Sequence, residues 1–551
     1  MWRGRELSRG GFVLGKIGAW RWLGLAAVGA LMLTVYWVGL IRPYGLATLG
    51  LRPHLDIARL TRGHPGQQLA LMFTYVALLG LYYLAWRLCH VPRAAAAGPK
   101  PTERRLWVVL VATIAAINLA VLSLYPIGAA DVFDYIAQGR EISAWHGDPF
   151  YIPAAAFKAE PVLSYTAWSS ITTLYGPAWQ LMGAALTRLA GSSLLINLLA
   201  FKTLALLFFA GCLLVVAAIL RRAAPERALP AVCLFGLNPL IIYEVAGNGH
   251  NDIVMVFWML LGFYFLCRER HSLAALSLTA GVLTKFVPGF IAPVVLVYSL
   301  SRLPAGWPRW RFLLLTGLAC AALVAAVAGP FWRGGDMLAA HQRLYMLTTS
   351  LPAFVEALLE PYFGPLLSET WVGRVSLILT ILAMAVAAWH VWRSSRRPAE
   401  HQPAPWLAAA RASTMVLLFY LLVACLWFES WYTLWPLSLA VLLPEGPLAT
   451  AAVLLTGVGI WKPIYFDFFL SRRFVPPRLR RETLLAPAVL GLAWLFAAAS
   501  VLQAWRRPRP LAVRQGARPA PARGLPSGGS GVYHWSSALS DETRQHEESD
   551  G

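Results

Sequence analysis

Apolar runs of about twenty residues recur along most of this chain, and each is long enough to cross a bilayer as a helix. The runs are continuously apolar, whereas the strands of a membrane barrel alternate apolar and polar residues. Only 13% of the 551 residues are charged, against about 25% in an average soluble protein. The sequence therefore predicts an all-α polytopic membrane bundle of about 12–14 spans, half-helices included.

The positive charge of the chain lies mainly beside the apolar runs. The formal net charge is +21, and many arginines stand in short loops next to a span, as the positive-inside rule describes for cytoplasmic loops. This distribution indicates a multi-pass protein of the cell membrane with no nucleic-acid partner. The basic N-terminal segment precedes an apolar run too long for a signal-peptide core, so we expect a retained anchor. The six cysteines are scattered and form neither a metal spacing nor a disulfide framework.

Spans and basic loops divide the chain into three predicted parts. Residues 1–105 form a two-span hairpin with a cytoplasmic loop, and residues 106–505 form the main membrane module. Residues 506–551 form a disordered cytoplasmic tail, because they are rich in Pro, Arg, Gly and Ser. The third span runs outward, so residues 126–192 are expected on the extracytoplasmic side. They contain one moderately apolar helix, Tyr175–Ala190, which we expect to lie in the membrane interface.

The C-terminal half is harder to order. T-K-F-V-P-G (Thr284–Gly289) breaks one apolar run into two expected half-helices. The late spans are expected at 412–429, 432–443, 447–461 and 485–505. The span count places the loop 462–484 outside, although it is basic. Either a late span is miscounted or the loop binds an anionic lipid. Its basic residues are Lys462, Arg472, Arg473, Arg478, Arg480 and Arg481.

The stretch P-I-G-A-A-D-V-F-D-Y-I-A-Q-G-R (Pro126–Arg140) places two carboxylates just outside the apolar layer. Ionised residues near a membrane are costly unless they face water, protein or a substrate. The spacing puts Asp131, Asp134 and Tyr135 on one side of a helix. Asp131 suits a general base that deprotonates an acceptor hydroxyl, and it also suits a helix N-cap or a first-turn acid. Asp134 is either a supporting acid or a solvated neighbour.

A second polar turn, G-N-G-H-N-D (Gly247–Asp252), lies on the same predicted side between two apolar spans. It offers His250, Asn251 and Asp252 as candidate binding side chains, and Glu244 lies about one helical turn below. The alternative is a polar interhelical loop in which Asp252 caps the next helix.

Lys285 lies beside the expected helix break, inside an apolar run where a lysine costs about 2.5–3.5 kcal/mol. Something anionic must offset this cost. The functional interpretation is a contact to a phosphate. The alternative is a side chain that snorkels to the interface or pairs with Glu244 or Glu429.

Aromatic residues crowd the stretch W-F-E-S-W-Y-T-L-W (Trp427–Trp435), which contains Glu429, Trp431 and Tyr432. An aromatic belt at the membrane interface explains this composition. Aromatic faces also suit sugar rings and polyprenyl tails, so a belt and a binding site can coincide here.

In their order, these patches resemble the bacterial polyprenyl-phosphate-mannose-dependent mannosyltransferases of the GT-C superfamily. The resemblance covers most of residues 106–436. Phe133 stands where the family usually has tyrosine, and Asp134 where a small polar residue is usual. The resembling patches are Asp131–Tyr135, Gly147–Tyr151, Tyr175–Pro177, Asn238–Pro239, Gly247–Asp252, Lys285–Pro288 and Trp431–Trp435.

The resemblance implies a reaction and a set of site residues. Asp131 would be the catalytic base that helps to move a hexose, by likeness mannose, from a polyprenyl-phosphate donor to an extracytoplasmic glycan or lipid acceptor with inversion. Lys285 would steady the departing phosphate. The resemblance implies no certain cofactor and leaves a divalent metal open. Together with the residues singled out above, the candidate substrate-binding residues are Asp134, Tyr135, Tyr175, Glu244, His250, Asn251, Asp252, Lys285, Glu429, Trp431 and Tyr432.

Two other functions stay open on the sequence. A secondary transporter would have broken helices with charges near the middle of the bilayer, but no internal repeat is visible. A lipid-linked polymer ligase would use a large loop with His and Arg as its main site. The loop 330–366 keeps this alternative open, through Arg333, Asp336, His341 and Arg343.

Overall fold

The computed structural model divides the chain into a compact unit, Met1–Pro510, and a second unit, Leu511–Gly551. The residues that it describes are 6–90, 100–334, 337, 347–396, 404–470, 491, 494–496, 498–499 and 502–503. The predicted tail, residues 506–551, lies outside the described residues, so the fold is that of the first unit. The predicted three-part division of the chain stays a prediction.

The described residues form helices and no strand, with isolated bridges at Gly45–Leu124 and Thr348–Trp427. Seven helices of this part are long and apolar enough to cross a membrane, or up to eight if a bent pair is one span. This confirms the all-α polytopic prediction. The seven are Trp20–Tyr44 (the end of α1, Glu6–Tyr36, with η1, Trp37–Ile41, and α2, Arg42–Tyr44), Pro65–Cys89 (α5), Thr102–Val121 (in α6, Lys100–Val121), Leu194–Ala223 (α9), Trp307–Phe331 (α15, Trp307–Ala328, with η7, Gly329–Phe331), Pro365–Ser395 (α17) and Trp406–Ala424 (α18, Trp406–Phe419, with η10, Tyr420–Ala424).

The bent pair joins α10 (Pro225–Gly236) to α11 (Pro239–Ile242) and the π-helix η5 (Tyr243–Gly247) at 51°. Asn238 lies at the bend, where its side chain caps α11 through two backbone N–H groups. The predicted count of about 12–14 spans included half-helices. Three shorter apolar helices correspond to such segments, namely α12 (Asp252–Cys267), α13 (His271–Thr284) and Pro447–Lys462 in α20 (Pro447–Leu470).

The predicted helix break at Thr284–Gly289 is confirmed. Helix α13 ends at Thr284, and Lys285 is extended, with φ −157° and ψ 137°. A 3-10 turn, η6 (Val287–Phe290), then leads into α14 (Ala292–Arg302). Pro288 has no N–H to donate, so the α-helix cannot continue through it. The extended residue turns the Lys285 side chain towards the start of α12.

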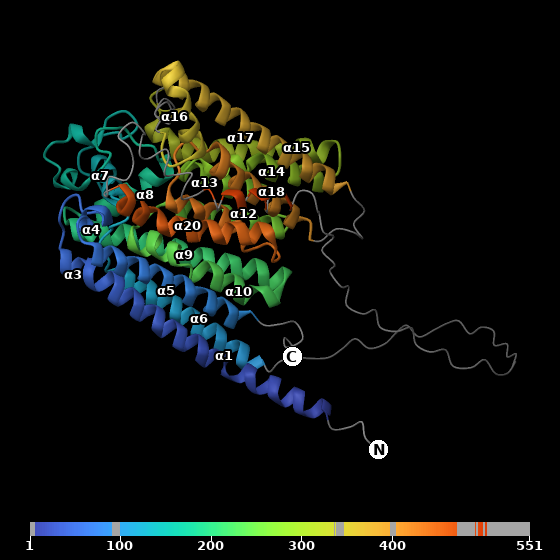
Figure 1. The fold of residues 1–551 in the computed structure, drawn as a ribbon. Helices are drawn as coiled ribbons and strands as arrows, with labels where there is room; N and C mark the ends of the chain where they lie inside the picture. Colours follow the sequence, from blue (N-terminus) through green and yellow to red (C-terminus); the bar gives the residue numbers. More distant parts are fainter. Residues whose placement is uncertain are drawn as a thin grey trace, which may run out of the picture. The chain divides into compact units, whose positions relative to one another are not determined.

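The segment between α6 and α9 is helical only in pieces, namely α7 (Asp131–Ser143), η3 (Ala154–Ala156), η4 (Pro161–Tyr165) and α8 (Pro177–Ala190). Helix α7 packs along α8, and both contact α9. They lie together at one end of the bundle (Figure 1). Helix α8 has 14 residues and is not among the candidate spans, in agreement with the expectation that it does not cross.

Among the N-terminal spans, α1 packs against both α5 and α6, and α5 contacts α10 (Figure 1). Short helices connect or follow the long ones. They are α3 (Leu46–Leu49), α4 (Ile57–Thr61), α16 (Leu351–Phe363), η11 (Ser430–Thr433) and α19 (Leu434–Ala440).

Two predictions for the C-terminal half are wrong. The segment 432–443 is not a span, because α19 has only seven residues. It is preceded by the 3-10 helix η11, which begins after an extended residue, Glu429 (φ −120°, ψ 153°). The segment 462–484 is not a loop from its start, because α20 continues to Leu470 and buries Lys462. The other basic residues of that segment and most of the span expected at 485–505 lie outside the described residues.

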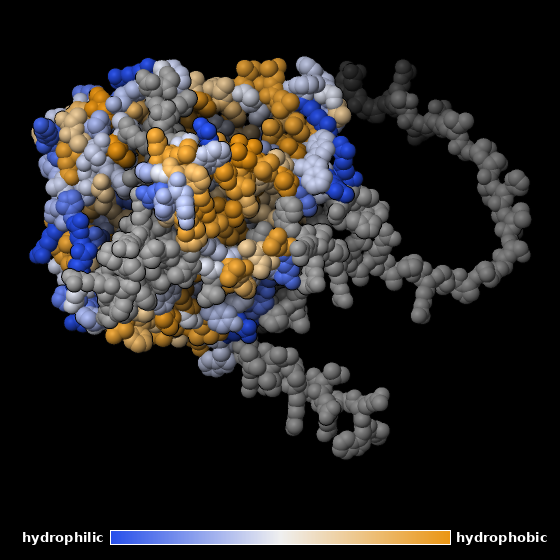
Figure 2. Space-filling model, turned by 45° about the horizontal axis from the view of Figure 1, so that its top comes forward, coloured by the Kyte–Doolittle hydropathy of each residue, from blue (hydrophilic) through white to orange (hydrophobic). Residues whose placement is uncertain are grey.

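Large apolar side chains cover the outer surfaces of several long helices, including Phe73, Val108, Leu207, Leu318 and Leu377. Figure 2 shows hydrophobic residues across the middle of one face, with hydrophilic residues gathered towards its left and right edges. Such a band would be unfavourable in water, and it fits helices whose backbone groups are paired internally within lipid.

Candidate active site

Asp131 is the first residue of α7, and its carboxylate does not cap the helix. The N-cap residue is Ala130, which has no side chain for this purpose. Oδ1 of Asp131 instead accepts a hydrogen bond of 2.9 Å from the Tyr175 hydroxyl. The side chain is partly exposed. The Tyr175 hydroxyl therefore orients the Asp131 carboxylate, which stays partly accessible from outside the protein.

Lys285 forms a buried ion pair with Asp252. Its Nζ lies 3.0 Å and 2.9 Å from the two oxygens of Asp252. The Asp252 side chain is fully buried and that of Lys285 is 8% exposed. Nε1 of Trp435 donates to the same carboxylate at 2.6 Å. The suggested pairing of Lys285 with Glu244 or Glu429 is thus wrong, because the start of α12 brings Asp252 closer.

Three aromatic rings surround the Lys285 ammonium. Nζ lies 5.7 Å from the ring centroid of Tyr175, 5.1 Å from that of Tyr432 and 5.7 Å from that of Trp435. Rings at these distances attract a cation through their quadrupoles. Tyr175 therefore contacts both groups: its hydroxyl binds Asp131 and its ring faces Lys285. The predicted acid and the predicted cation converge on one tyrosine.

Gly176 makes this convergence sterically feasible. Its N–H donates to the Thr284 carbonyl at 3.0 Å, which ties the Tyr175 segment to the break that holds Lys285. A Cβ at Gly176 would lie 2.1 Å from the carbonyl oxygen of Leu283. Only a residue without a side chain allows the two backbones to come this close.

The turn Gly247–Asp252 contributes a buried polar cluster. Asn248 donates to Glu244 Oε2 at 2.7 Å, and its own oxygen accepts the Gly128 N–H at 3.0 Å, close to Asp131 in the chain. His250 Nε2 lies 3.2 Å from Glu244 Oε2, near enough for an ion pair but outside hydrogen-bond geometry. Burial lowers the pKa of His250, but the contact with Glu244 and nearby acidic charges outweigh burial and raise it.

Two aromatic residues border this cluster. The Trp431 ring stacks on His250 with centroids 4.0 Å apart. Tyr135 donates to Asn251 Oδ1 at 3.4 Å, and its ring meets that of Tyr175 edge-on at 4.9 Å. Asn251 therefore connects the second polar turn to α7 and to the Asp131 segment.

Asp134 has a different environment from Asp131. Its buried carboxylate accepts the N–H groups of Ala167 (3.2 Å) and Trp168 (2.9 Å). Burial and the charge of Asp131 raise the pKa of Asp134 to about 7, although these two hydrogen bonds oppose the rise. The Asp134 carboxylate therefore binds the backbone of the segment between η4 and α8 and holds this segment against α7.

Glu429 belongs to a second ion pair. Its Oε2 lies 2.6 Å from Lys462 Nζ, and its Oε1 accepts a hydrogen bond of 2.7 Å from Trp427 Nε1. The Trp427 ring meets Trp168 edge-on at 5.5 Å. Glu429 pairs with Lys462 and not with Lys285. Trp168, whose N–H binds Asp134, links the Glu429 cluster to the loop that Asp134 anchors.

Sequence reasoning missed three residues of this region. Trp435 and Lys462 were seen only as part of an aromatic stretch and a basic loop. Lys202 was not singled out, although a lone lysine inside the apolar helix α9 is a detectable signal. Its buried Nζ donates to the carbonyls of Leu122 (2.7 Å) and Leu124 (2.6 Å). It therefore fixes the turn that leads from α6 towards Asp131.

The segment between α6 and α9 contains a further acidic pair, Glu141 and Asp148. Asp148 pairs with Arg333 at 3.1 Å, whereas both Glu141 carboxylate oxygens are buried without a partner among the described residues. Burial and the charge of Asp148 raise the pKa of Glu141 to about 8. The part of the chain that the structure describes contains no group of three or more His, Cys, Asp or Glu suited to a metal. Asp336, His341 and Arg343 of the alternative ligase site lie outside the described residues.

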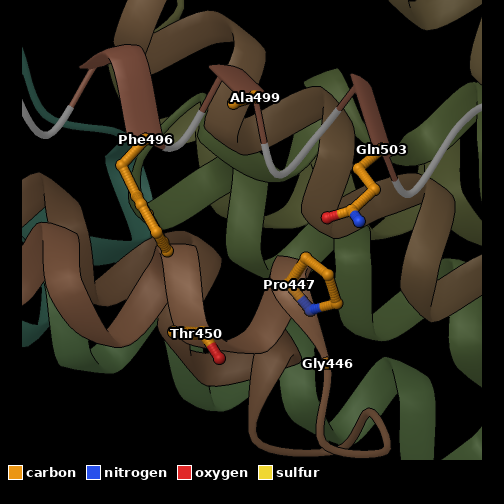
Figure 3. Close-up of a pocket in the computed structure, with 6 residues that line it drawn as sticks. All are labelled: Gly446, Pro447, Thr450, Phe496, Ala499 and Gln503. Atoms are coloured by element: carbon orange, nitrogen blue, oxygen red, sulfur yellow. The ribbon is translucent and has the colours of Figure 1, made fainter.

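A cavity of about 410 Å³ lies apart from these clusters. Figure 3 shows Phe496 and Gln503 pointing towards the start of α20, where Pro447 and Thr450 line the opposite wall. Its lining includes none of the predicted site residues, so cavity size does not identify the candidate site.

The fold is a multi-pass helical bundle that brings a tyrosine-oriented acid, a buried lysine and stacked aromatic rings together at one end. The comparisons with known proteins define the class as a membrane glycosyltransferase. A family model described as "Alpha-(1->6)-mannopyranosyltransferase, N-terminal domain" matches residues 21–301. The match covers just over half of the chain, and the chain belongs to this family. The predicted relationship to GT-C mannosyltransferases is confirmed.

Two relatives extend the comparison. An alpha-(1->6)-mannopyranosyltransferase A from Mycobacterium tuberculosis is 26% identical over 408 residues, which cover 70% of this chain and 74% of the relative. A protein of the same name from Corynebacterium glutamicum is 27% identical over 187 residues, which cover 33% of this chain and 37% of the relative.

Proposed function

We propose that this enzyme transfers a mannosyl unit from a polyprenyl-phosphate-linked donor to an extracytoplasmic glycan or lipid acceptor, with inversion. The observation that carries the proposal is the meeting of Asp131 and Lys285 at Tyr175. Glycosyl transfer from a phosphate-linked donor needs a base for the acceptor and positive charge for the leaving group. Tyr175 contacts both groups, Asp131 through its hydroxyl and Lys285 through its ring, and the names of both relatives agree with mannose as the transferred sugar.

Asp131 acts as the general base in this proposal. Its Oδ1 is held by Tyr175, so we assign Oδ2 to accept the proton of the acceptor hydroxyl. The acceptor oxygen attacks the anomeric carbon as the bond from that carbon to the phosphate oxygen breaks. The proton ends on Asp131, and the electron pair of the broken bond leaves with the polyprenyl phosphate. A phosphate is a weakly basic leaving group, so this step requires no general acid.

Lys285 stabilises the departing phosphate electrostatically. In the structure, its charge is offset by Asp252 and enclosed by three rings. A charge held in such a setting interacts more strongly than one in water, because little solvent screens it. Donor binding would let the phosphate share the ammonium with Asp252. The Trp435 hydrogen bond would then keep Asp252 in place.

The buried cluster around His250 is assigned to the sugar. His250 Nδ1 and Asn251 Nδ2 are buried and have no hydrogen-bond partner among the described residues. Buried polar groups are normally paired, so these atoms are suited to hydroxyls of a bound sugar. Trp431, which stacks on His250, offers an apolar face beside them.

Inversion sets the anomeric form of the donor. If the product is α-(1→6)-linked, as the names of the relatives suggest, an inverting displacement requires a β-linked mannosyl phosphate. Purified enzyme should therefore use the β-linked donor and reject its α-anomer. Use of the α-anomer to make an α-linked product would contradict direct displacement by an acceptor hydroxyl.

Asp131→Asn tests the base directly. Asparagine keeps an oxygen for the Tyr175 hydrogen bond but cannot take the proton, so transfer should fall about 10²–10⁴-fold. Mannosyl transfer to an α-(1→6)-linked mannooligosaccharide is the measurement, and unchanged thermal unfolding shows that the variant is folded. Asp56→Asn, at the exposed N-cap of α4, is the matched control and should stay active. Near-normal transfer by Asp131→Asn would reject the assignment.

A further inference from the structure

The end of the bundle away from Asp131 contains a second candidate binding site. A cleft of about 150 Å³ lies between α14, α15 and the end of α17, lined by Ser301, Arg309, Trp392, Ser395 and Arg396. Figure 1 shows α7 and α8 at one end of the bundle, and the start of α15 and the end of α17 at the other.

The chain path agrees with this placement. Helix α12 starts at Asp252, in the candidate active site, and ends at Cys267. Just beyond that end, Glu269 lies 3.5 Å from Arg302, the residue next to Ser301. The cleft is therefore at the end of α12 that is opposite to Asp252 and Lys285, and it is separate from the proposed reaction.

Two arginines in the cleft share one indole ring. The guanidinium carbons of Arg309 and Arg396 lie 5.6 Å and 5.0 Å from the Trp392 ring centroid. Two like charges around one ring repel each other unless an anion lies near them. Neither arginine forms an ion pair with a carboxylate of the described residues, and the neighbouring Glu269 pairs with Arg302. Among the described residues, no carboxylate therefore offsets the positive charge of the cleft.

Two serines add hydroxyl donors to this charge. The Oγ atoms of Ser301 and Ser395 are 2.9 Å apart. Ser301 also donates to the Tyr298 carbonyl (2.6 Å), and Ser395 donates to that of Val391 (2.8 Å). A hydroxyl has one proton and rotates freely, so either serine can turn its O–H towards a ligand oxygen in place of these partners. Guanidinium and hydroxyl donors around a small cleft are suited to a phosphate.

The surroundings indicate a lipid as the source of this phosphate. Trp307 and Trp310, at the start of α15, are exposed, and Leu314 and Leu318 continue the exposed apolar surface along the same helix. Tryptophans typically mark the level of the lipid head groups. A head group in the cleft would thus have its acyl chains beside the apolar face of α15.

We propose that this cleft binds the phosphate of an anionic membrane lipid, with Arg309 and Arg396 as the charged ligands and the two serines as additional donors. Basic pockets between transmembrane helices recognise lipid head groups in this way. The bound lipid would hold the ends of α14, α15 and α17 together by neutralising the two guanidinium groups.

The test uses the full-length protein in nanodiscs of phosphatidylcholine with added phosphatidylglycerol. Native mass spectrometry counts the phosphatidylglycerol molecules that stay bound. Arg309→Gln/Arg396→Gln should weaken retention at least about tenfold, the loss expected for one charge-assisted hydrogen bond. Arg311→Gln/Arg374→Gln removes two exposed arginines from the same two helices and should retain the lipid.

Three outcomes decide between the explanations. Equal loss in the control pair would show a general effect of positive charge and overturn the proposal. Displacement of the lipid by inorganic phosphate alone would assign the site to a free anion and overturn the choice of a lipid. If the double variant does not fold, Arg396→Gln replaces it, because Arg396 is exposed at the end of α17. Unchanged retention in this single variant, together with failure of the double, would also overturn the proposal.

Discussion

The pair Lys285–Asp252 allows the structural and the catalytic roles of a buried charge to be separated. Lys285→Met removes the ammonium and leaves Asp252, which is fully buried, with the Trp435 N–H as its remaining side-chain donor among the described residues. Breaking a buried ion pair on one side typically costs about 3–5 kcal/mol, because the remaining charge is uncompensated. We expect a loss of this size from the single variant.

The double variant Lys285→Met/Asp252→Asn should recover most of this loss. It leaves no charge at either position, and asparagine keeps an oxygen for the Trp435 N–H. The expected coupling between the two positions is about 2–3 kcal/mol. Denaturant unfolding, followed by tryptophan fluorescence in a fixed detergent, measures all four proteins of the cycle.

Activity then separates the two roles of Lys285. If its ammonium contacts the donor phosphate, the double variant is folded but does not transfer mannose. The pair Glu429–Lys462, with side chains 16% and 10% exposed, provides the matched cycle through Glu429→Gln and Lys462→Met. It should show weaker coupling, because the Glu429 carboxylate is less buried than that of Asp252. Normal transfer by the folded double variant, or a stable Lys285→Met single variant, would refute the reasoning.

Two further predictions concern the loop that carries Tyr175. In the folded protein, the pKa of Asp134 is raised from 3.8 to about 7. The protonated carboxyl therefore stabilises the folded protein below about pH 4. This contribution, about 4 kcal/mol at most, is lost as the pH rises through 7. Asp134→Asn should flatten thermal stability measured across this pH window, and an unchanged slope would contradict the raised pKa. Gly176→Ala should cost about 1–3 kcal/mol or more and reduce transfer, because its Cβ would strike the Leu283 carbonyl. Gly80→Ala, where a Cβ meets nothing within 4 Å, is the control for thermal unfolding and should be neutral or stabilising.

Local sequence patterns predicted many of the elements of this fold. Hydrophobic run length predicted a helical chain that crosses the membrane many times, because burial in lipid depends on the residues of each run alone. Pro288 predicted the break before α14, since a missing N–H acts at its own position. The same reasoning failed at 432–443, where the apolar content suggested a span but the structure has the seven-residue helix α19.

The candidate site was only partly accessible from the sequence. Asp131 and Lys285 were recognisable because ionised groups are rare beside apolar runs. The partner of Lys285 was not, because Asp252 is 33 residues away and the choice among several acids depends on how α12 and α13 pack. Asp134 and Asp131 share one turn of α7, yet the surrounding loop directs the first to backbone N–H groups and the second to Tyr175.

The sequence by itself determined that this protein is a helical membrane bundle with acidic and basic groups at its helix ends, because hydrophobicity and helix breaks act locally along the chain. Only the tertiary structure decided which of those groups meet. Tyr175 reaches Asp131 across 44 residues, and Trp435 reaches Asp252 across 183. Hydrogen bonds and ion pairs act over a few ångströms, so contacts between residues this far apart in the chain exist only after the helices have packed.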